Sequence, residues 1–452
     1  MARLFGTDGV RGIANKELTC ELAYKIGKYA AWVLTSEIHK PRILIGKDTR
    51  ISGDMLQNAI AAGICSVGAE AIIVGVIPTP GIAYLTRKYN ADAGVVISAS
   101  HNSFEFNGIK WIDRDGLKLN DEVEDKIESL INNNELLPDL PVGENVGRVV
   151  SLKNSSELYL EYLISCIDAD LSGKKIVLDC ANGAASFIAP TLFKMLGATV
   201  YPYYNTPDGI NINNQCGSTY TKRLQQIVVE KGADIGFAFD GDADRMLAVD
   251  ECGMLIDGDV IMGICAIDKK SMGELKNNVV VTTVMSNIGL ERSLDKYDIE
   301  IIKTGVGDRY VLEEMLKNDH NLGGEQSGHV IFLDKNTTGD GILTALELIK
   351  VLNKSGKRLS DLAKQITIYP QVLVNINVEN DKKYDFDKNE AISRQIDLAE
   401  KILGNEGRVL VRTSGTEPLV RVMLEGKDDE QINELALSIA KAIEKELNGK
   451  IR

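Results

Sequence analysis

The sequence is poor in several residue types, and each shortage argues against a class of protein. Only 6% of the 452 residues are aromatic, and Lys and Arg (51) are outnumbered by Asp and Glu (65), which gives a net charge of −14. Sequence-independent binding to nucleic acid depends on basic side chains that neutralise phosphates, so we expect no nucleic-acid partner. The seven cysteines include no C-x-x-C pair. Their scatter indicates neither a zinc site nor a redox dithiol, and it favours free thiols in a reducing compartment.

Long apolar runs are also missing. The most apolar region, residues 59–85, is interrupted by glycines, Glu70 and two prolines, which makes it too broken to span a membrane. The first residues, MARLFGTDG, lack the charged and then apolar pattern of a secretory leader. We therefore expect a cytoplasmic protein with no membrane partner.

The chain does contain a recurring pattern of strands and helices. Units of strand, polar loop, helix and strand are predicted from about residues 42, 175 and 279 onward. Three such units predict three related α/β domains, each with a mixed sheet and helices on both faces. Beyond Pro370 the pattern becomes that of a smaller C-terminal α+β domain, and we expect the active site in the central cleft. The predicted domains are residues 1–150, 151–254, 255–368 and 369–452.

The stretch SASHNSFEFNGIK, residues 98–110, follows a short apolar strand predicted at 93–97. Ligands of α/β proteins bind at the carboxyl ends of strands. Ser100 next to His101 has the composition of an activated nucleophile, although an isolated Ser-His pair is more often part of an ordinary polar loop. Ser98 lies two residues earlier and is expected to take no part in the reaction.

The strongest motif is DGDADR, residues 240–245. Asp240, Asp242 and Asp244 alternate in a turn of small residues, so their carboxylates can converge as hard oxygen ligands for a divalent cation such as Mg²⁺. The spacing also fits the start of an EF-hand loop, but Arg245 occupies the position that needs glycine, and the flanks predict strands. We interpret the segment as a metal site between two strands, with a solvated acidic hairpin as the alternative.

Two further polar segments are candidate binding loops. GGEQSGH, residues 323–329, offers Glu325, Gln326, Ser327 and His329, whose donors and acceptors suit sugar hydroxyls. Of the four histidines, His101 and His329 fall in candidate loops, whereas His39 and His320 have polar neighbours and are predicted at the surface.

The second of these loops is RTSGTEPLVR, residues 412–421. Backbone amides and hydroxyls of a Ser-Gly-Thr turn, flanked by two guanidinium groups, make a phosphate cradle, and a purely structural turn is the alternative. The cradle residues are Arg412, Ser414, Gly415, Thr416 and Arg421.

These motifs, in this order, resemble the α-D-phosphohexomutase family over essentially the whole chain. The diagnostic stretches are LFGTDGVRG, VGDRYV, GGEQSGH, FLDKNTTGDG and RTSGTEPLVRVMLEG. The chain departs from the family pattern at Ser103, where proline is common, and at Trp111-Ile112, where an aromatic pair is common. Both departures concern loop shape and leave the reacting residues in place.

The resemblance implies that Ser100 carries a phosphoryl group, and that a phosphoserine oxygen joins Asp240, Asp242 and Asp244 around one Mg²⁺. It implies an intramolecular phosphotransferase that interconverts glucosamine 6-phosphate and glucosamine 1-phosphate for amino-sugar and peptidoglycan precursors. Glucosamine 1,6-bisphosphate would be the intermediate, and it or glucose 1,6-bisphosphate the activator. The partner would be this small sugar phosphate, and the enzyme a monomer or homodimer. The alternative within the family is a phosphoglucomutase/phosphomannomutase.

The resemblance also assigns roles to charged residues. Arg11, Lys110 and Arg245 would neutralise the transferring phosphoryl group, since phosphoryl transfer depends mainly on positioning and electrostatics. Lys110 or His329 would act as general base or acid, and the sequence leaves this choice open.

The resemblance assigns the remaining substrate contacts to the two binding loops. Glu325 and Ser327 would bind sugar hydroxyls, Gln326 would help to select the substituent at C2, and the cradle would hold the non-reacting phosphate. A metal-dependent phosphatase and a non-catalytic sugar-phosphate sensor are the rival classes, which assays of phosphate release and of turnover separate.

Overall fold

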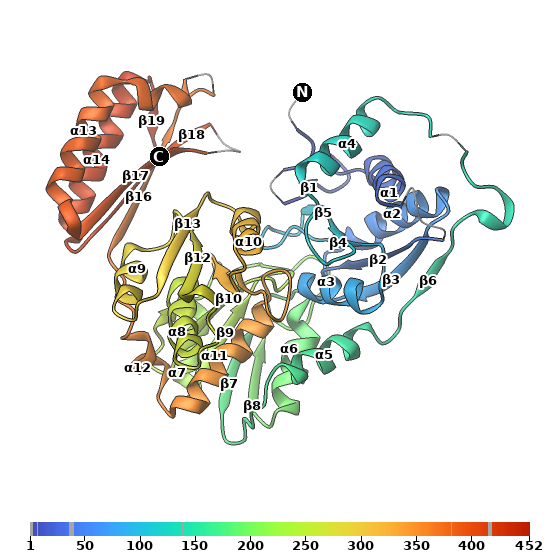
Figure 1. The fold of residues 1–452 in the computed structure, drawn as a ribbon, viewed down its shortest axis with the longest axis horizontal. Coiled ribbons are helices and arrows are strands. Elements are labelled where there is room, and N and C mark those ends of the chain that lie inside the picture. The colour runs from blue at the N-terminus through green and yellow to red at the C-terminus, as the bar shows by residue number, and fades with distance from the viewer. Residues whose placement is uncertain (1–2, 7, 36–39, 138, 381, 415–417) are drawn as a thin grey trace. The chain divides into compact units, whose positions relative to one another are not determined.

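The computed structural model describes residues 3–6, 8–35, 40–137, 139–380, 382–414 and 418–452 (Figure 1). The chain forms two compact units, Met1–Met285 with Asp298–Gln365, and Ser286–Tyr297 with Ile366–Arg452. The first unit holds three sheets and the second holds one. No helix among the described residues is long and apolar enough to cross a membrane.

The first sheet has six strands in the order β1-β5-β4-β2-β3-β6. It is mixed, since β2, β3, β4 and β6 run parallel while β1 and β5 pair antiparallel. The strands are β1 Val10–Ile13, β2 Arg42–Lys47, β3 Glu70–Val76, β4 Ala93–Ile97, β5 Phe106–Asp113 and β6 Val149–Ser151. The helices are α1 Cys20–Thr35, α2 Gly53–Ser66, α3 Thr79–Lys88 and α4 Asp121–Asn132.

Alternation along β2 explains why helices cover both faces of this sheet. Ile43 and Ile45 belong to the core formed with α1, α2 and α4. Gly46 faces the other way, where an added Cβ would lie 2.6 Å from the Ile82 side chain of α3. Successive side chains of a strand point to opposite faces, so one apolar strand supplies two cores.

The second sheet has five strands in the order β11-β10-β9-β7-β8. Its strands are β7 Lys175–Asp179, β8 Thr199–Tyr203, β9 Ile235–Phe239, β10 Met246–Asp250 and β11 Leu255–Ile256, with helices α5 Ser155–Ser165, α6 Ala185–Met195 and α7 Lys222–Lys231. Strands β9 and β10 pair antiparallel, with Met246 opposite Phe239. The strand–turn–strand predicted around DGDADR is therefore confirmed.

The third sheet has four strands in the order β13-β12-β14-β15. Its strands are β12 Val279–Thr283, β13 Glu300–Thr304, β14 Leu322–Gly324 and β15 Val330–Phe332, with helices α8 Gly258–Ser271, α10 Asp308–Lys317, α11 Gly341–Ser355 and α12 Leu359–Ala363. The helix after β12, α9 (Ile288–Asp295), groups with the second unit. An added Cβ at Gly289 would lie 1.8 Å from the carbonyl oxygen of Thr367, which shows how closely α9 approaches that segment.

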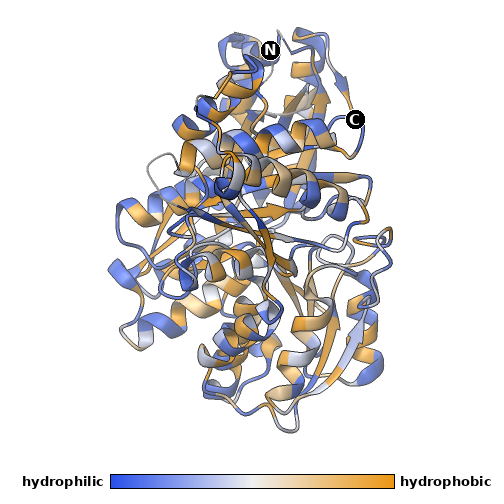
Figure 2. Ribbon diagram, turned by 90° about the vertical axis from the view of Figure 1, so that its right-hand side faces the viewer, coloured by the Kyte–Doolittle hydropathy of each residue, from blue (hydrophilic) through white to orange (hydrophobic). Residues whose placement is uncertain are grey.

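The second unit contains a four-stranded sheet in the order β17-β18-β16-β19. Its elements are β16 Gln371–Asn377, α13 Glu390–Leu403, β17 Gly407–Thr413, β18 Leu419–Gly426, α14 Asp429–Glu446 and β19 Lys450–Ile451. Across the structure as a whole, Figure 2 shows largely apolar strands and helices with one polar side, as expected for helices that cover sheets. The predicted fold of three α/β domains and a smaller α+β domain is confirmed.

His320 corrects one sequence-based prediction. Its polar neighbours in the sequence predict a surface position, but the side chain is buried, and Asn277 Nδ2 lies 3.2 Å from its Nδ1. The error arises because this burial involves a contact with Asn277, a residue 43 positions away in the sequence. His39 lies outside the described residues.

Asp179, at the end of β7, gives a first prediction. Its Oδ1 accepts a hydrogen bond from Ala181 N, but its buried Oδ2 has no hydrogen-bond partner. Burial raises the pKa of Asp179 to about 6, although the amides of Ala181 and Gly217 oppose this shift. The folded state therefore holds the proton more tightly than the unfolded state, and stability falls as pH rises from about 4 to about 6.

We expect Asp179→Asn, which mimics the neutral form, to be more stable than the wild type at about pH 7 by up to roughly 3 kcal/mol. The advantage should shrink at about pH 4, where the wild-type carboxyl is itself largely protonated. Urea unfolding of the wild type and the variant at the two pH values measures this difference in stability. An advantage that does not change with pH would show that Asp179 is charged in the folded protein at both.

Candidate active site

Ser100 follows the carboxyl end of β4, the place where α/β proteins bind ligands. It is buried and its φ of +50° is left-handed, which is uncommon for a residue other than glycine. Its Oγ donates to Asp240 Oδ2 at 2.5 Å, and His101 Nδ1 lies 3.4 Å away. The structure therefore brings the serine of the first sheet onto the aspartate loop of the second.

Asp240, Asp242 and Asp244 form the turn between β9 and β10. All three are buried, and each offers a carboxylate oxygen within 4.8 Å of the others. Asp242 Oδ1 and Asp244 Oδ1 have no hydrogen-bond partner. Burial, together with the charges of Asp244 and Asp242, raises the pKa of Asp240 well above its usual value. Unsatisfied, mutually repelling carboxylates fit a divalent cation, which would bind those oxygens and relieve the repulsion.

A buried arginine that the sequence analysis did not single out holds the Ser100 loop. Arg50 donates to the carbonyl oxygens of Ser100 (2.9 Å), Asn102 (2.8 Å) and Phe106 (3.0 Å), and it contacts that of Ser103. A planar guanidinium has five N–H donors in a rigid fork, so one side chain can fix several carbonyl groups of a loop. In the sequence, Arg50 is merely one polar residue after a strand.

Asp48 and Ser98 complete this support. Asp48 Oδ2 lies 2.8 Å from Arg50 Nε and accepts the Ser98 hydroxyl at 2.7 Å. Ser98 Oγ in turn accepts the backbone N–H of Ser100 at 3.0 Å. The sequence predicts no part in the reaction for Ser98. Its contacts with Asp48 and with the Ser100 amide show that it supports the backbone of Ser100. Asn213, from the second sheet's domain, also donates to the Ser100 carbonyl at 2.8 Å.

We expect Arg50→Met to lower the stability of the first unit by about 3–5 kcal/mol, because it leaves Asp48 as a buried charge without its partner. The double variant Asp48→Asn/Arg50→Met should recover part of that loss, since it removes the uncompensated charge. Chemical denaturation of the three proteins provides the comparison. A double variant no more stable than Arg50→Met would mean that the loop carbonyls, and not the ion pair, set the cost.

Charged side chains of alternating sign run from the aspartate loop around the site. Lys110 on β5 lies 3.2 Å from Asp242 Oδ2 and 2.9 Å from Asp8 Oδ2. Asp8 also pairs with Lys118 at 2.8 Å, and Lys118 contacts Asp308 at the start of α10. The charges of Asp242 and Asp8 outweigh burial and raise the pKa of Lys110 above its usual value. Lys110 therefore remains a cation at neutral pH.

His329 closes this ring of charges. Its Nδ1 lies 3.5 Å from Asp244 Oδ2 and its Nε2 3.6 Å from Asp308 Oδ2. Gly339 N donates to Nε2 at 3.1 Å, and an added Cβ at Gly339 would lie 2.5 Å from the ring. Burial alone would lower the pKa of His329, but the hydrogen bond and charge of Asp244 raise it. Both ring nitrogens of His329 are thus engaged by the protein.

His101 differs from His329 in its surroundings. Burial, Arg245 and Arg11 lower its pKa to about 4, so its imidazole is neutral at pH 7. Arg245 Nη1 lies 3.4 Å from His101 Nδ1, while the Nε atoms of Arg245 and Arg11 are buried without hydrogen-bond partners. Two arginines with spare donors, close to Ser100, provide the positive charge that an anionic ligand requires.

The predicted sugar-binding loop is the hairpin between β14 and β15. Met246 N donates to Gly328 O at 3.0 Å, which ties this loop to β10 and so to the aspartate turn. Ser327 Oγ is buried without a hydrogen-bond partner, and Glu325 contributes to raising the Arg245 pKa. Gln326 Nε2 donates to Asp257 Oδ2 at 3.3 Å. The loop is therefore close to the aspartates and still has unsatisfied polar atoms.

The predicted phosphate cradle lies in the second unit. Arg412 on β17 is directly opposite Arg421 on β18. Burial and the Arg421 charge lower the pKa of Arg412, as expected for two cations on neighbouring strands. Ser414 N bonds to Leu419 O at 2.8 Å. Gly415 and Thr416 lie outside the described residues.

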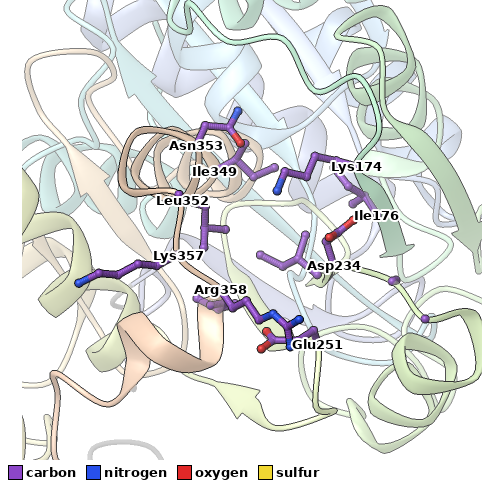
Figure 3. A pocket seen from close by; sticks show the side chains of 14 residues that line it. Lys174, Ile176, Asp234, Glu251, Ile349, Leu352, Asn353, Lys357 and Arg358 are labelled. Carbon is purple, nitrogen blue, oxygen red and sulfur yellow. The ribbon is translucent and has the colours of Figure 1, made fainter.

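A cavity lies at the other end of the second sheet, where strands β7 and β9 begin (Figure 3). Its volume is about 440 Å³, and Lys174, Ile176, Asp234 and Arg358 are among its lining residues. None of the predicted site residues within the described part of the chain lines it. The carboxyl ends of the strands therefore remain the candidate active site.

Comparisons with known proteins show the family to which the chain belongs. Family models described as phosphoglucomutase/phosphomannomutase match the chain: alpha/beta/alpha domains I (residues 2–137), II (157–253) and III (257–369), and the C-terminal domain (373–442). The phosphoglucosamine mutase of Thermoanaerobacter sp. (strain X514) is 58% identical over 448 residues, 99% of this chain and 100% of that protein. The phosphoglucosamine mutase of Clostridium novyi (strain NT) is 58% identical over 450 residues, with the same coverage.

Solved structures show the same fold at low sequence identity. A phosphoglucomutase/phosphomannomutase family protein from Burkholderia thailandensis superposes with a TM-score of 0.83, at 24% identity and over 98% of this chain and 97% of that one. The Aspergillus fumigatus N-acetylphosphoglucosamine mutase in complex with GlcNAc-6P and magnesium gives 0.67 at 18% identity, over 98% and 95%. This chain belongs to the phosphoglucomutase/phosphomannomutase family, the α-D-phosphohexomutases, in which proteins of matching length and 58% identity are phosphoglucosamine mutases.

Proposed function

We propose that the protein interconverts glucosamine 6-phosphate and glucosamine 1-phosphate through a phosphorylated Ser100 and a glucosamine 1,6-bisphosphate. The observation that carries the proposal is the 2.5 Å contact of Ser100 Oγ with Asp240 Oδ2, inside a buried cluster of three carboxylates. The full-length identity of 58% to phosphoglucosamine mutases supports this substrate. The product would supply the synthesis of UDP-N-acetylglucosamine and cell-wall precursors. The enzyme would be a cytoplasmic monomer or homodimer.

Asp240, Asp242 and Asp244 would hold a divalent cation, for which Mg²⁺ is our choice because magnesium is present in the Aspergillus complex. The buried Oδ1 atoms of Asp242 and Asp244, which have no hydrogen-bond partner, are the feature that fits this ion. When bound, it would neutralise charge on the transferring phosphoryl group and add a ligand bond to the phosphoserine.

The chain's own residues perform the transfer. In the forward step the bond from phosphorus to Ser100 Oγ breaks, a bond to the sugar hydroxyl oxygen forms, and the proton lost by that hydroxyl is passed to Ser100 Oγ. Lys110 and Arg245 stay cationic beside the reacting group, because neighbouring carboxylates outweigh burial and raise the pKa of each. The return step transfers the other phosphate of the bisphosphate back to Ser100.

Contacts and charge favour a different residue as acid and base from Lys110 or His329. A cationic Lys110 cannot accept a proton, and both nitrogens of His329 are already engaged. His101 is neutral and its Nδ1 lies 3.4 Å from Ser100 Oγ. We therefore propose that His101 relays the proton between the sugar hydroxyl and Ser100 Oγ, accepting it from one oxygen and giving it to the other, while Lys110 and His329 position the aspartates.

Substrate binding would use the two polar loops. Glu325 and Ser327 would bind the sugar hydroxyls, and the cradle of Arg412, Ser414, Gly415, Thr416 and Arg421 would bind the phosphate that is not reacting. Arg11 would add a further donor to the phosphoryl group through its unused Nε.

The test combines mass and turnover. Intact mass before and after phosphatase treatment should differ by about 80 Da, one phosphoryl group. The purified protein with Mg²⁺ and glucose 1,6-bisphosphate should convert glucosamine 1-phosphate to glucosamine 6-phosphate without releasing inorganic phosphate. Stoichiometric phosphate release would make the protein a phosphatase, and the absence of both turnover and release would contradict a catalytic role.

A further inference from the structure

Gln326 sits where the sugar-binding loop meets the start of α8. Gly258 N, the first residue of that helix, donates to Gln326 O at 3.0 Å. An added Cβ at Gly258 would lie 2.1 Å from the carbonyl oxygen of Glu325, so glycine is needed for the helix to approach this closely. The loop and the helix start are thus held together, and the Gln326 backbone has one defined position.

Asp257 fixes the side chain as well. It is the N-cap of α8, and its Oδ1 accepts Val260 N at 3.1 Å while its Oδ2 lies 3.3 Å from Gln326 Nε2. An ionised carboxylate has acceptors and no donor, so it faces the NH₂ group of the amide and not its oxygen. Gln326 Oε1 is therefore the atom that remains to meet a ligand.

We propose that Asp257 is a specificity-determining positioning residue, which turns the Gln326 amide so that its oxygen accepts a hydrogen bond from the 2-ammonium group of glucosamine phosphate. The inference rests on the proposed function and deepens it. An ammonium group only donates, whereas the 2-hydroxyl of glucose phosphate both donates and accepts. An amide held in one orientation distinguishes these groups, while an amide free to turn would serve a hydroxyl equally well.

The test compares kcat/KM for glucosamine 1-phosphate and glucose 1-phosphate, with the same Mg²⁺ and glucose 1,6-bisphosphate. In Asp257→Asn the new amide can present either its oxygen or its NH₂ group, so Gln326 loses its fixed orientation. We expect the preference for glucosamine 1-phosphate to fall about tenfold, the scale of a hydrogen bond to a charged group. Asn is as good an N-cap as Asp, so α8 should be retained.

Two further variants distinguish a change in substrate preference from a general effect of replacing a helix N-cap. Asp428→Asn is the matched control, because Asp428 caps α14 by accepting Gln431 N and belongs to the other unit. It should keep the wild-type preference. Gln326→Leu should lose the preference, and adding Asp257→Asn to it should change the ratio no further, since Asp257 acts through Gln326.

The outcomes distinguish a failure of the Asp257 role from a failure of the proposed function. A wild type that prefers glucosamine 1-phosphate, with an unchanged ratio in Asp257→Asn, overturns the role of Asp257 and leaves the proposed function standing. A wild type without that preference overturns both. If Asp257→Asn does not fold, an unchanged preference in Gln326→Leu is sufficient to overturn the inference, and its loss supports it.

Discussion

Ser100→Ala should lower mutase turnover by about four to six orders of magnitude, the scale seen when a nucleophile is removed from other enzymes. Without Oγ there is no atom to carry the phosphoryl group between the two sugar positions. The change also removes the hydrogen bond to Asp240, which costs about 1 kcal/mol. The variant should therefore fold, since Arg50 and Asn213 hold the loop through its carbonyl groups.

Ser103→Ala is the appropriate control, because Ser103 lies in the same loop and is exposed. Ser98→Ala is unsuitable, since Ser98 bridges Asp48 and the Ser100 amide. The measurements are turnover of glucosamine 1-phosphate and intact mass. Ser100→Ala should also lack the mass increment of about 80 Da. Wild-type-like turnover, or an undiminished increment, would move the phosphoryl group to another residue.

The sequence was sufficient to predict the aspartate turn and the serine loop because both are local. The alternation Asp240, Asp242, Asp244 within one turn restricts where the carboxylates can point, and the apolar run at 93–97 places Ser100 at the end of a buried strand. Short-range periodicity of this kind determines local structure directly. The four motifs also carried the family resemblance that the comparisons confirmed.

The residues that hold these motifs in place could not be predicted in the same way. Arg50 reaches carbonyl groups about fifty residues away, Asn213 reaches the Ser100 loop from another sheet, and Asp308 meets Lys118 across 190 positions. Each is a single polar residue whose partner depends on how the sheets pack. His320 shows the same limit, because polar neighbours in the sequence gave no sign of its burial.

The ring of charges also explains why the metal loop should depend on its cation. Asp242 Oδ2 is satisfied by Thr79 Oγ1 at 2.7 Å and by Lys110, but its Oδ1 is buried without a hydrogen bond. Lys110 and His329 compensate part of the charge of Asp242 and Asp244, but these two carboxylates still raise the pKa of Asp240, so a bound cation would stabilise the cluster. A bound divalent cation would stabilise the folded form according to its concentration relative to its dissociation constant.

Asp242→Asn should accordingly have two effects of opposite sign. Without Mg²⁺ the variant should unfold at a higher temperature than the wild type, because a charge that raises the pKa of Asp240 is gone. Lys110 keeps its ion pair with Asp8, and the hydrogen bond from Thr79 is kept. Addition of Mg²⁺ should raise the unfolding temperature of the variant by less than that of the wild type. The Mg²⁺ concentration for half-maximal turnover should rise at least about tenfold, since even the loss of a residue that only supports a metal ligand weakens metal binding by that factor.

Asp250→Asn supplies the matched control for the metal loop. Asp250 is a buried aspartate at the end of β10, where its Oδ1 accepts Cys252 N at 2.9 Å and Met254 N at 2.8 Å. It belongs to the same hairpin without contributing to the cluster of three, so its replacement should leave the Mg²⁺ titration unchanged. Identical Mg²⁺ dependence of stability and turnover in the wild type and in Asp240→Asn, Asp242→Asn and Asp244→Asn would show that the loop binds no catalytic cation. The aspartates would then serve only to orient Ser100 and Lys110, and the arginines near Ser100 would have to supply the positive charge for phosphoryl transfer.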